Sequence, residues 1–210
     1  MSKNRPHITW VITLAVACSS VLAFIHLKET VQILGFIPDL WTRYFGLTLI
    51  TSFFIHAGLM HLVGNLYFLI VFGSRVEDFL GKKNFLALIL LSTVIGGIAH
   101  ALLDPRKSQA CIGASGGISG VIVFYCLAFP YAKLGMFIWY FYYGRWFTMP
   151  AFFALFIWVI YQFAMIFMQI GGYSNVSALA HIGGALTGIL FWIYFRKLDN
   201  SSSVQETRLG

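Results

Sequence analysis

Six long apolar runs alternate with short polar segments along the chain. Each run has close to the roughly 20 residues that an α-helix needs to cross the hydrocarbon core of a bilayer. The pattern therefore predicts an all-α membrane protein, built as one transmembrane domain over residues 1–197 with a polar, disordered tail over 198–210. The six predicted spans cover approximately residues 8–27, 53–73, 84–103, 112–132, 149–170 and 175–195.

The composition supports a membrane protein. Of the 210 residues, 59% are hydrophobic and 10% are charged, whereas a soluble domain is about half apolar and about a quarter charged. The net charge of +7 would suit a nucleic-acid partner, but the basic residues are scattered among short loops, so we expect a lipid bilayer instead. The first run has no clear small-x-small cleavage site, and we interpret it as an uncleaved span rather than a signal peptide.

The three cysteines carry little information about chemistry. Cys18, Cys111 and Cys126 show no regular spacing, and two of them lie inside apolar runs. Neither a disulfide framework nor a zinc site is supported by this pattern.

The basic residues also predict the orientation of the chain. With six spans, both termini lie on one side of the membrane, and that side receives ten of the 14 lysines and arginines. Because lysine and arginine are enriched in cytoplasmic loops, both termini are predicted to be cytoplasmic. The second, fourth and sixth spans then begin at the outer face.

Polar side chains gather at the outer ends of those three spans. His61 and Asn65 lie in the second span, Ser115 in the first turn of the fourth, and His181 near the second turn of the sixth. At a rise of about 1.5 Å per residue, all four lie within about 5–15 Å of the outer interface. Polar groups are costly at that depth and by default indicate function.

Ser115 lies in a segment rich in small residues, 113-GASGGISG-120. One interpretation is a helix-packing face, because glycine and serine let membrane helices approach closely, and another is an N-cap serine. The catalytic interpretation makes Ser115 a nucleophile at a helix N-terminus, where free N–H groups favour developing negative charge. A phosphate-binding loop is excluded, since no Lys-Ser/Thr pair follows.

His181 shares a helix face with Gly184 and Gly188, and that face is predicted to lie close to another helix. A histidine here could be a buried residue that is hydrogen-bonded across helices. It could also be a general base, the commonest catalytic role of imidazole. The sixth span contains no acid to complete a triad, so a catalytic unit would be a dyad of His181 and Ser115.

The second span carries His56, His61 and Asn65. His61 and Asn65 are four residues apart and share a helix face, which suits two hydrogen-bond donors directed at an oxyanion. They are poor candidates for metal ligands, because no glutamate accompanies them and asparagine binds zinc weakly. His56 points elsewhere and is assigned a structural role.

These motifs together resemble the rhomboid family of intramembrane serine proteases. The resemblance implies that Ser115 is the nucleophile, that His181 is the base and later the acid, and that His61 and Asn65 bind the oxyanion. It also implies structural roles near the site for Gly113, Gly116 and Gly184. The matching pieces are His56-x4-His61-x3-Asn65, Gly73-x3-Glu77, Gly113-Ala114-Ser115-Gly116 and Ala180-His181-x-Gly183.

The same resemblance implies an activity and a location. The expected substrates are single-pass transmembrane proteins, cut near the outer face of the membrane at a small residue. The resemblance implies no metal and no organic cofactor. The size is similar to that of the basic six-span bacterial form, so the expected location is a bacterial inner membrane. The oligomeric state stays open.

Two departures from the family pattern bear on the site. Many members carry Trp-Arg or Trp-Thr where this chain has Leu47-Thr48, which affects the expected packing of the first outer loop. Some members carry an aromatic residue that stacks on the histidine, where this chain has Ser119. His181 must then be oriented by another group, and Ser119 is expected to bond back to its own helix.

Three other functions stay open at this stage. A non-catalytic rhomboid-like protein would retain membrane clients without cutting them, although such proteins usually lack the serine or the histidine. A transpeptidase-type relative would pass the acyl group to an amine. A small transporter is disfavoured, because the cores of spans two, four and six contain no charged residue and no inverted repeat is visible.

The fifth span is crowded with aromatic residues. They are either bulk that faces lipid or a lateral gate packed loosely against the second span. The residues are Phe152, Phe153, Phe156, Trp158, Tyr161, Phe163 and Phe167.

Overall fold

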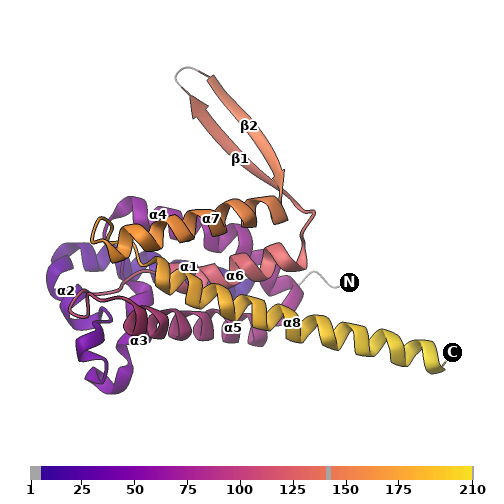
Figure 1. Cartoon of the computed structure of the whole chain (residues 1–210), viewed down its shortest axis with the longest axis horizontal. Coiled ribbons are helices and arrows are strands. Elements are labelled where there is room, and N and C mark those ends of the chain that lie inside the picture. Colours follow the sequence, from indigo (N-terminus) through magenta and orange to yellow (C-terminus); the bar gives the residue numbers. More distant parts are fainter. Residues whose placement is uncertain (1–5, 141–142, 210) are drawn as a thin grey trace.

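The protein, described here by a computed structural model over residues 6–140 and 143–209, is mostly helical. Its long helices run roughly along one common direction, as Figure 1 shows. The helices are α1 (His7–Ala23), α2 (Leu27–Leu34), α3 (Thr48–Thr51), α4 (Leu59–Phe68), α5 (Ser74–Leu103), α6 (Ser115–Ala128), α7 (Ala151–Ile170) and α8 (Ala178–Leu209).

Four stretches of the described residues are long and apolar enough to cross a membrane: His7–Leu34, Leu59–Leu103, Ala151–Ile170 and Ala178–Leu198. The second stretch has 45 residues and contains two of the predicted spans, which are separated at Gly81, where φ is 75°. α6 is apolar but shorter, with 14 residues. The chain is an integral membrane protein with several spans, and the count of six stays a prediction.

Two predicted spans begin later than the apolar pattern indicates. The run at 53–73 becomes α-helical only at Leu59, because Ile55 and Gly58 adopt extended backbone. The run at 112–132 shortens to α6, because Gly113 has a φ of 113° that no helix contains and Pro130 follows the helix end. Hydropathy shows which residues are apolar, whereas the backbone dihedral angles determine where the helix begins.

A two-stranded antiparallel hairpin adds β structure that the all-α prediction lacks. Strand β1 (Lys133–Tyr140) pairs with β2 (Tyr143–Pro150), with Lys133 opposite Pro150 and Tyr140 opposite Tyr143. The segment is rich in aromatic residues, which favour strands over helices. In Figure 1 the hairpin projects from the bundle between α6 and α7.

α8 continues through the polar tail as far as Leu209, where the sequence predicts a disordered segment. No glycine or proline occurs between residues 189 and 209, so nothing in the backbone ends the helix earlier. Figure 1 shows this extension leaving the bundle at the C-terminal end.

Three helices form the centre of the bundle, with α6 packed against both α5 and α8. α6 is buried along most of its length. A methyl group added at Gly184 of α8 would collide with the carbonyl of Gly116, and one at Gly188 would collide with the carbonyl of Gly120. The small residues of α6 and α8 therefore bring the two backbones together, as the packing interpretation of the glycines requires.

Glu77 of α5 joins this centre to α1. Its carboxylate accepts hydrogen bonds from Ile8 N at 2.9 Å, Thr9 N at 2.7 Å and Thr9 Oγ1 at 2.8 Å. These donors are the free N–H groups at the start of α1, where a negative charge is favourable. The Gly73-x3-Glu77 motif therefore serves the packing of the first helix and lies outside the candidate site.

The loop between α2 and α3 is held by Arg43. Its guanidinium donates to the carbonyl of Gln32 and, at 3.0 Å, to the carbonyl of Gly35. At the Leu47-Thr48 departure, Leu47 is exposed and Thr48 is buried. The loop is therefore anchored to the backbone at the C-terminal end of α2 rather than through the side chain of Leu47.

Candidate active site

Ser115 is the first residue of α6, and the turn before it sets its position. Gly113 has a φ of 113°, a conformation that strongly favours glycine, and its N–H donates to Ser52 O at 2.9 Å. The next N–H, that of Ala114, donates to Nε2 of His56 at 3.3 Å. The chain thus enters α6 through two fixed hydrogen bonds, with Ser115 at the helix N-terminus.

His56 lies between α1 and the turn before Ser115. Its side chain is fully buried, and its Nδ1 lies 2.9 Å from Ser20 Oγ of α1. Because Nε2 accepts the N–H of Ala114, His56 joins α1 to the turn that positions Ser115.

Ser115 and His181 meet across the interface of α6 and α8. Nε2 of His181 lies 2.8 Å from Oγ of Ser115, within ordinary hydrogen-bond distance. The close backbone approach at Gly184, one turn after His181, makes this contact possible. The structure therefore brings together the two residues that the sequence proposes as nucleophile and base.

A residue that the sequence analysis missed holds the other side of the imidazole. Nδ1 of His181 lies 2.9 Å from Oε1 of Gln162 in α7. Gln162 therefore lies beside the ring nitrogen of His181 that does not face Ser115. The available signal was the presence of two glutamines, Gln162 and Gln169, in an otherwise apolar span.

Ser119 takes no part in orienting His181. Its hydroxyl donates to the carbonyl of Ser115 at 2.7 Å, four residues back in the same helix. The prediction that Ser119 bonds to its own helix is confirmed.

His61 and Asn65 differ in their relation to the site. His61 lines the same cavity as Ser115 and His181, and its Nδ1 accepts the N–H of Ala57 at 3.4 Å. Asn65 is buried, and its amide nitrogen donates to the carbonyl of His61 at 2.8 Å. The structure brings His61 to the site, while the amide of Asn65 is engaged with its own helix and does not line the cavity.

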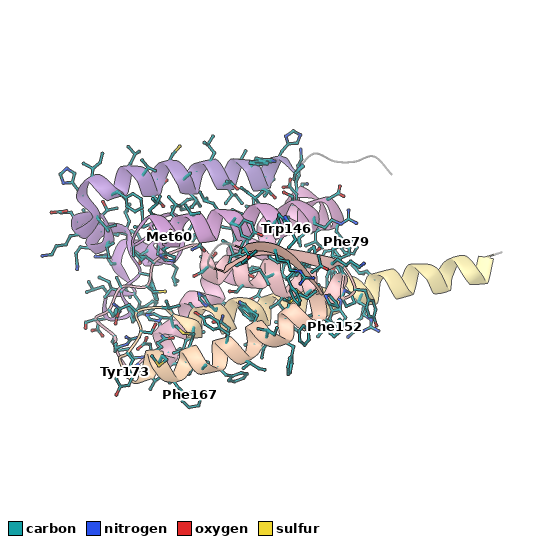
Figure 2. The ribbon with its side chains drawn as sticks, turned by 90° about the horizontal axis from the view of Figure 1, so that it is seen from above. Met60, Phe79, Trp146, Phe152, Phe167 and Tyr173 are labelled. Atoms are coloured by element: carbon teal, nitrogen blue, oxygen red, sulfur yellow. The ribbon has the colours of Figure 1, made fainter. Side chains whose placement is uncertain are left out.

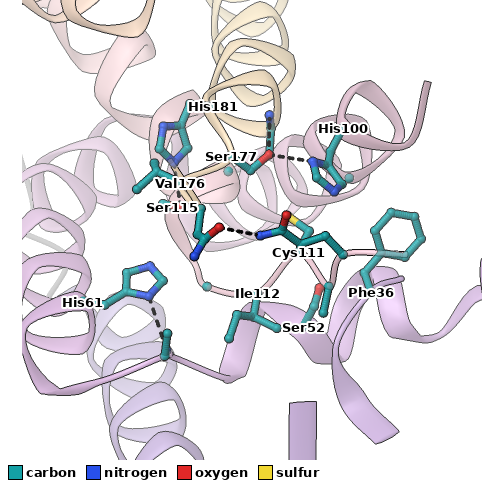
Figure 3. A pocket seen from close by; sticks show the side chains of 18 of the residues that line it. Phe36, Ser52, His61, His100, Cys111, Ile112, Ser115, Val176, Ser177 and His181 are labelled. Carbon is teal, nitrogen blue, oxygen red and sulfur yellow. Dashed lines mark hydrogen bonds between the residues drawn. The ribbon is translucent and has the colours of Figure 1, made fainter. Parts of the chain in front are cut away.

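The cavity has a volume of about 560 Å³ and opens beside the Ser115–His181 pair. Figure 3 shows His181, Ser115 and His61 around one part of it, with His100 and Ser177 around another. Ser177 Oγ lies 2.9 Å from Nδ1 of His100. The cavity thus offers polar groups beyond the pair itself, which suits the entry of water into an apolar bundle.

Asp104, in the loop after α5, supports the far side of the cavity. Burial alone would raise the pKa of Asp104, but hydrogen bonds from Arg106 and Gln169 hold that pKa well below its usual range. Arg106 also donates to the carbonyl of Ser174 at 2.9 Å. This charged network joins the loops that precede α6 and α8.

Within residues 6–140 and 143–209, no group of three or more histidine, cysteine, aspartate or glutamate side chains is placed to hold a metal ion. The cavity brings together the hydroxyl of Ser115 and the imidazoles of His181 and His61.

Comparison with known proteins identifies the family. The Rhomboid domain profile matches residues 39–198. The chain is 30% identical over 156 residues to Rhomboid protein 1, mitochondrial, of Saccharomyces cerevisiae, an alignment that covers 72% of this chain and 42% of the yeast protein. It is 28% identical over 154 residues to Rhomboid-like protease 3 of Toxoplasma gondii, covering 70% of this chain and 51% of that protein.

A human relative gives a similar result. The chain is 29% identical over 152 residues to Presenilin-associated rhomboid-like protein, mitochondrial, of Homo sapiens, covering 71% of this chain and 38% of the human protein. The chain thus spans about half, or less, of the length of these curated relatives. The profile match covers most of the chain and includes every residue of the candidate site, and the chain belongs to the rhomboid family.

Proposed function

We propose that the protein is an intramembrane serine endopeptidase that hydrolyses peptide bonds in or near transmembrane segments of other membrane proteins. The observation that carries the proposal is the 2.8 Å contact between Ser115 Oγ and His181 Nε2 at the edge of a polar-lined cavity. A nucleophile within hydrogen-bond reach of a base is the geometry that covalent catalysis requires. Membership of the rhomboid family supports the same activity.

The proposed reaction proceeds through an acyl-enzyme. Ser115 Oγ attacks the scissile carbonyl carbon while His181 Nε2 takes the hydroxyl proton. His181 then returns that proton to the leaving amine, and the carbon–nitrogen bond breaks. In the second half, His181 takes a proton from water, the hydroxide oxygen attacks the acyl carbon, and Ser115 leaves with the proton restored.

The oxyanion of the tetrahedral intermediate needs donors beside Ser115. The N–H groups at the start of α6 point toward that position because helix N-termini leave their first N–H groups free. His61 lines the cavity next to Ser115 and is the proposed side-chain donor. Asn65 would have to turn from the carbonyl of His61 to contribute.

We also propose six spans with both termini in the cytoplasm and the site toward the outer face. The support is the excess of lysine and arginine on the side that receives both termini. The expected location in a bacterial inner membrane gains no support from the relatives, since the yeast and human proteins are named mitochondrial. The orientation relative to basic loops does not depend on which membrane holds the protein.

The test is cleavage of a transmembrane substrate by the purified full-length protein in detergent. We expect two fragments whose masses sum to the substrate plus one water, because water accepts the acyl group. A product heavier by an added amine would identify a transpeptidase instead. Stable co-purification of an uncut substrate would contradict the proposal and favour a non-catalytic binding protein.

The two candidate oxyanion residues give a further prediction. We expect His61→Ala to lower kcat by about 10²–10³-fold, the usual cost of losing an oxyanion donor. Asn65→Ala is expected to have a smaller effect, because its amide bonds to its own helix. Measured kcat values for both variants check this, and a larger loss for Asn65→Ala would show that the asparagine turns toward the site during the reaction.

A further inference from the structure

α7 buries its polar residues and exposes its apolar ones. Its buried residues are Ala151, Gln162 and Gln169, while Phe156, Phe163 and other large side chains are exposed. Figure 2 shows Phe152 and Phe167 directed away from the bundle. Gln162 and Gln169 are seven residues apart, two helical turns, and therefore share one face. α7 contacts the rest of the bundle through Ala151 and Leu155 and through these two glutamines, which we call the polar stripe.

Each glutamine of this stripe has a defined partner. Oε1 of Gln169 accepts the N–H of Leu179 at 3.1 Å, and its Nε2 donates to Asp104. The first bond joins the C-terminal end of α7 to the start of α8, and the second joins it to the loop after α5. Gln162, two turns earlier, is 2% exposed and bonds to His181.

The bond from Gln162 decides which nitrogen of His181 carries the proton. The amide oxygen Oε1 accepts a hydrogen bond and has no hydrogen to give, so Nδ1 of His181 must be the donor. In the neutral ring Nε2 then keeps its lone pair, and that lone pair faces Ser115 Oγ at 2.8 Å. This tautomer is the one able to take the proton of the serine.

We propose that Gln162 is a positioning residue that holds His181 in the Nδ1–H tautomer, so that the Ser115–His181 pair is complete only while α7 packs against α8. The inference deepens the proposed function, since its effect on cleavage presupposes that function. Gln162 acts through His181 and does not touch the reacting atoms. A lateral displacement of α7 would break this bond and release the base.

The direct test measures which ring nitrogen of His181 carries the proton, and it needs no substrate. The full-length protein is labelled with ¹⁵N-histidine in detergent, and His181 is assigned as the signal lost in His181→Gln. We expect a protonated Nδ1 and an unprotonated Nε2 in wild type, and a mixture of tautomers in Gln162→Leu. Phe163→Leu, an exposed neighbour on α7, is the matched control and is expected to keep the wild-type signal.

Kinetic measurements distinguish a positioning role of Gln162 from a role in packing alone. We expect Gln162→Leu to lower kcat by about 10–100-fold with little change in KM, as for other residues that orient a functional histidine. Gln162→Glu keeps an acceptor at the same reach and is expected to recover part of the activity. Should Gln162→Leu fail to fold, Gln162→Asn replaces it, because the amide remains but is one methylene too short.

Failure of the inference differs from failure of the proposed function. An unchanged His181 tautomer in Gln162→Leu, or a wild type with its proton on Nε2, would overturn the positioning role whether or not the protein cleaves a substrate. A tautomer that depends on Gln162 in a protein that cleaves nothing would keep the positioning role and refute the protease.

Discussion

Replacing Ser115 with alanine is expected to reduce cleavage of a transmembrane substrate to background, a loss of about 10⁴-fold or more. The hydroxyl is the group that forms the acyl-enzyme, and within the cavity it lies 2.8 Å from the proposed base. His181→Ala is expected to cost nearly as much, because an unassisted hydroxyl is a weak nucleophile. The double variant should be no slower than either single one, since the two residues act as a unit. Initial rates with purified variants check all three values.

Ser119→Ala is the matched control for these variants. Ser119 is a buried serine one turn further along α6, and its hydroxyl bonds to the carbonyl of Ser115 rather than to His181. We expect it to keep activity within a few-fold of wild type (about 1 kcal/mol or less for one neutral hydrogen bond). Equal rates in wild type, Ser115→Ala and His181→Ala would identify a contaminating protease and remove support from the dyad.

The sequence predicts the parts of this molecule that depend on hydrophobicity and on local motifs. The apolar runs locate the long helices, because membrane spans must be apolar along most of their length. Ser115 and His181 stand out because polar groups near a helix start inside lipid are rare. Their meeting in space depends on the glycines that let α6 and α8 touch, and these were visible as a periodic pattern of small residues.

The orientation of α7 could not be predicted from its sequence. Nearly every residue of this helix is apolar, so periodicity does not distinguish a lipid face from a protein face. Gln162 and Gln169 identify the buried face. The exposure of Phe156, Phe163 and Phe167 agrees with lipid-facing bulk, and a lateral gate stays a prediction.

Backbone geometry explains the remaining differences. A φ of 113° at Gly113 moves the start of α6 to Ser115 itself, and hydropathy contains no information about that angle. The pairing of β1 with β2 depends on contacts between residues 133–140 and 143–150, which a reading of apolar spans treats as a loop. Asn65 shares a face with His61, yet the shared face did not determine whether its amide would turn to the cavity or to its own helix.

The second large effect is expected from a substitution at the contact between α6 and α8. A methyl group at Gly184 would lie 2.9 Å from the carbonyl carbon of Gly116 and closer still to its oxygen. Both atoms belong to backbone, so the strain can be relieved only by moving α8 away from α6. We expect Gly184→Ala to destabilise the protein by about 1–3 kcal/mol, the usual cost of overpacking. We also expect it to lower kcat by about 10²-fold, because a shift of about 1 Å breaks the alignment of a catalytic pair.

Gly64→Ala is the control for Gly184→Ala. It shows whether the protein is sensitive to replacement of any helical glycine or only to replacement at the α6–α8 contact. Gly64 lies within α4, near the site, and a methyl group added there meets no atom within 4 Å. Alanine also favours a helix over glycine by about 1 kcal/mol, so this variant is expected to be at least as stable as wild type and fully active. Thermal unfolding in detergent and kcat measured on the same preparations test both. Full activity in Gly184→Ala would show that α8 can move without separating His181 from Ser115, and the close approach of the two helices would then serve packing alone.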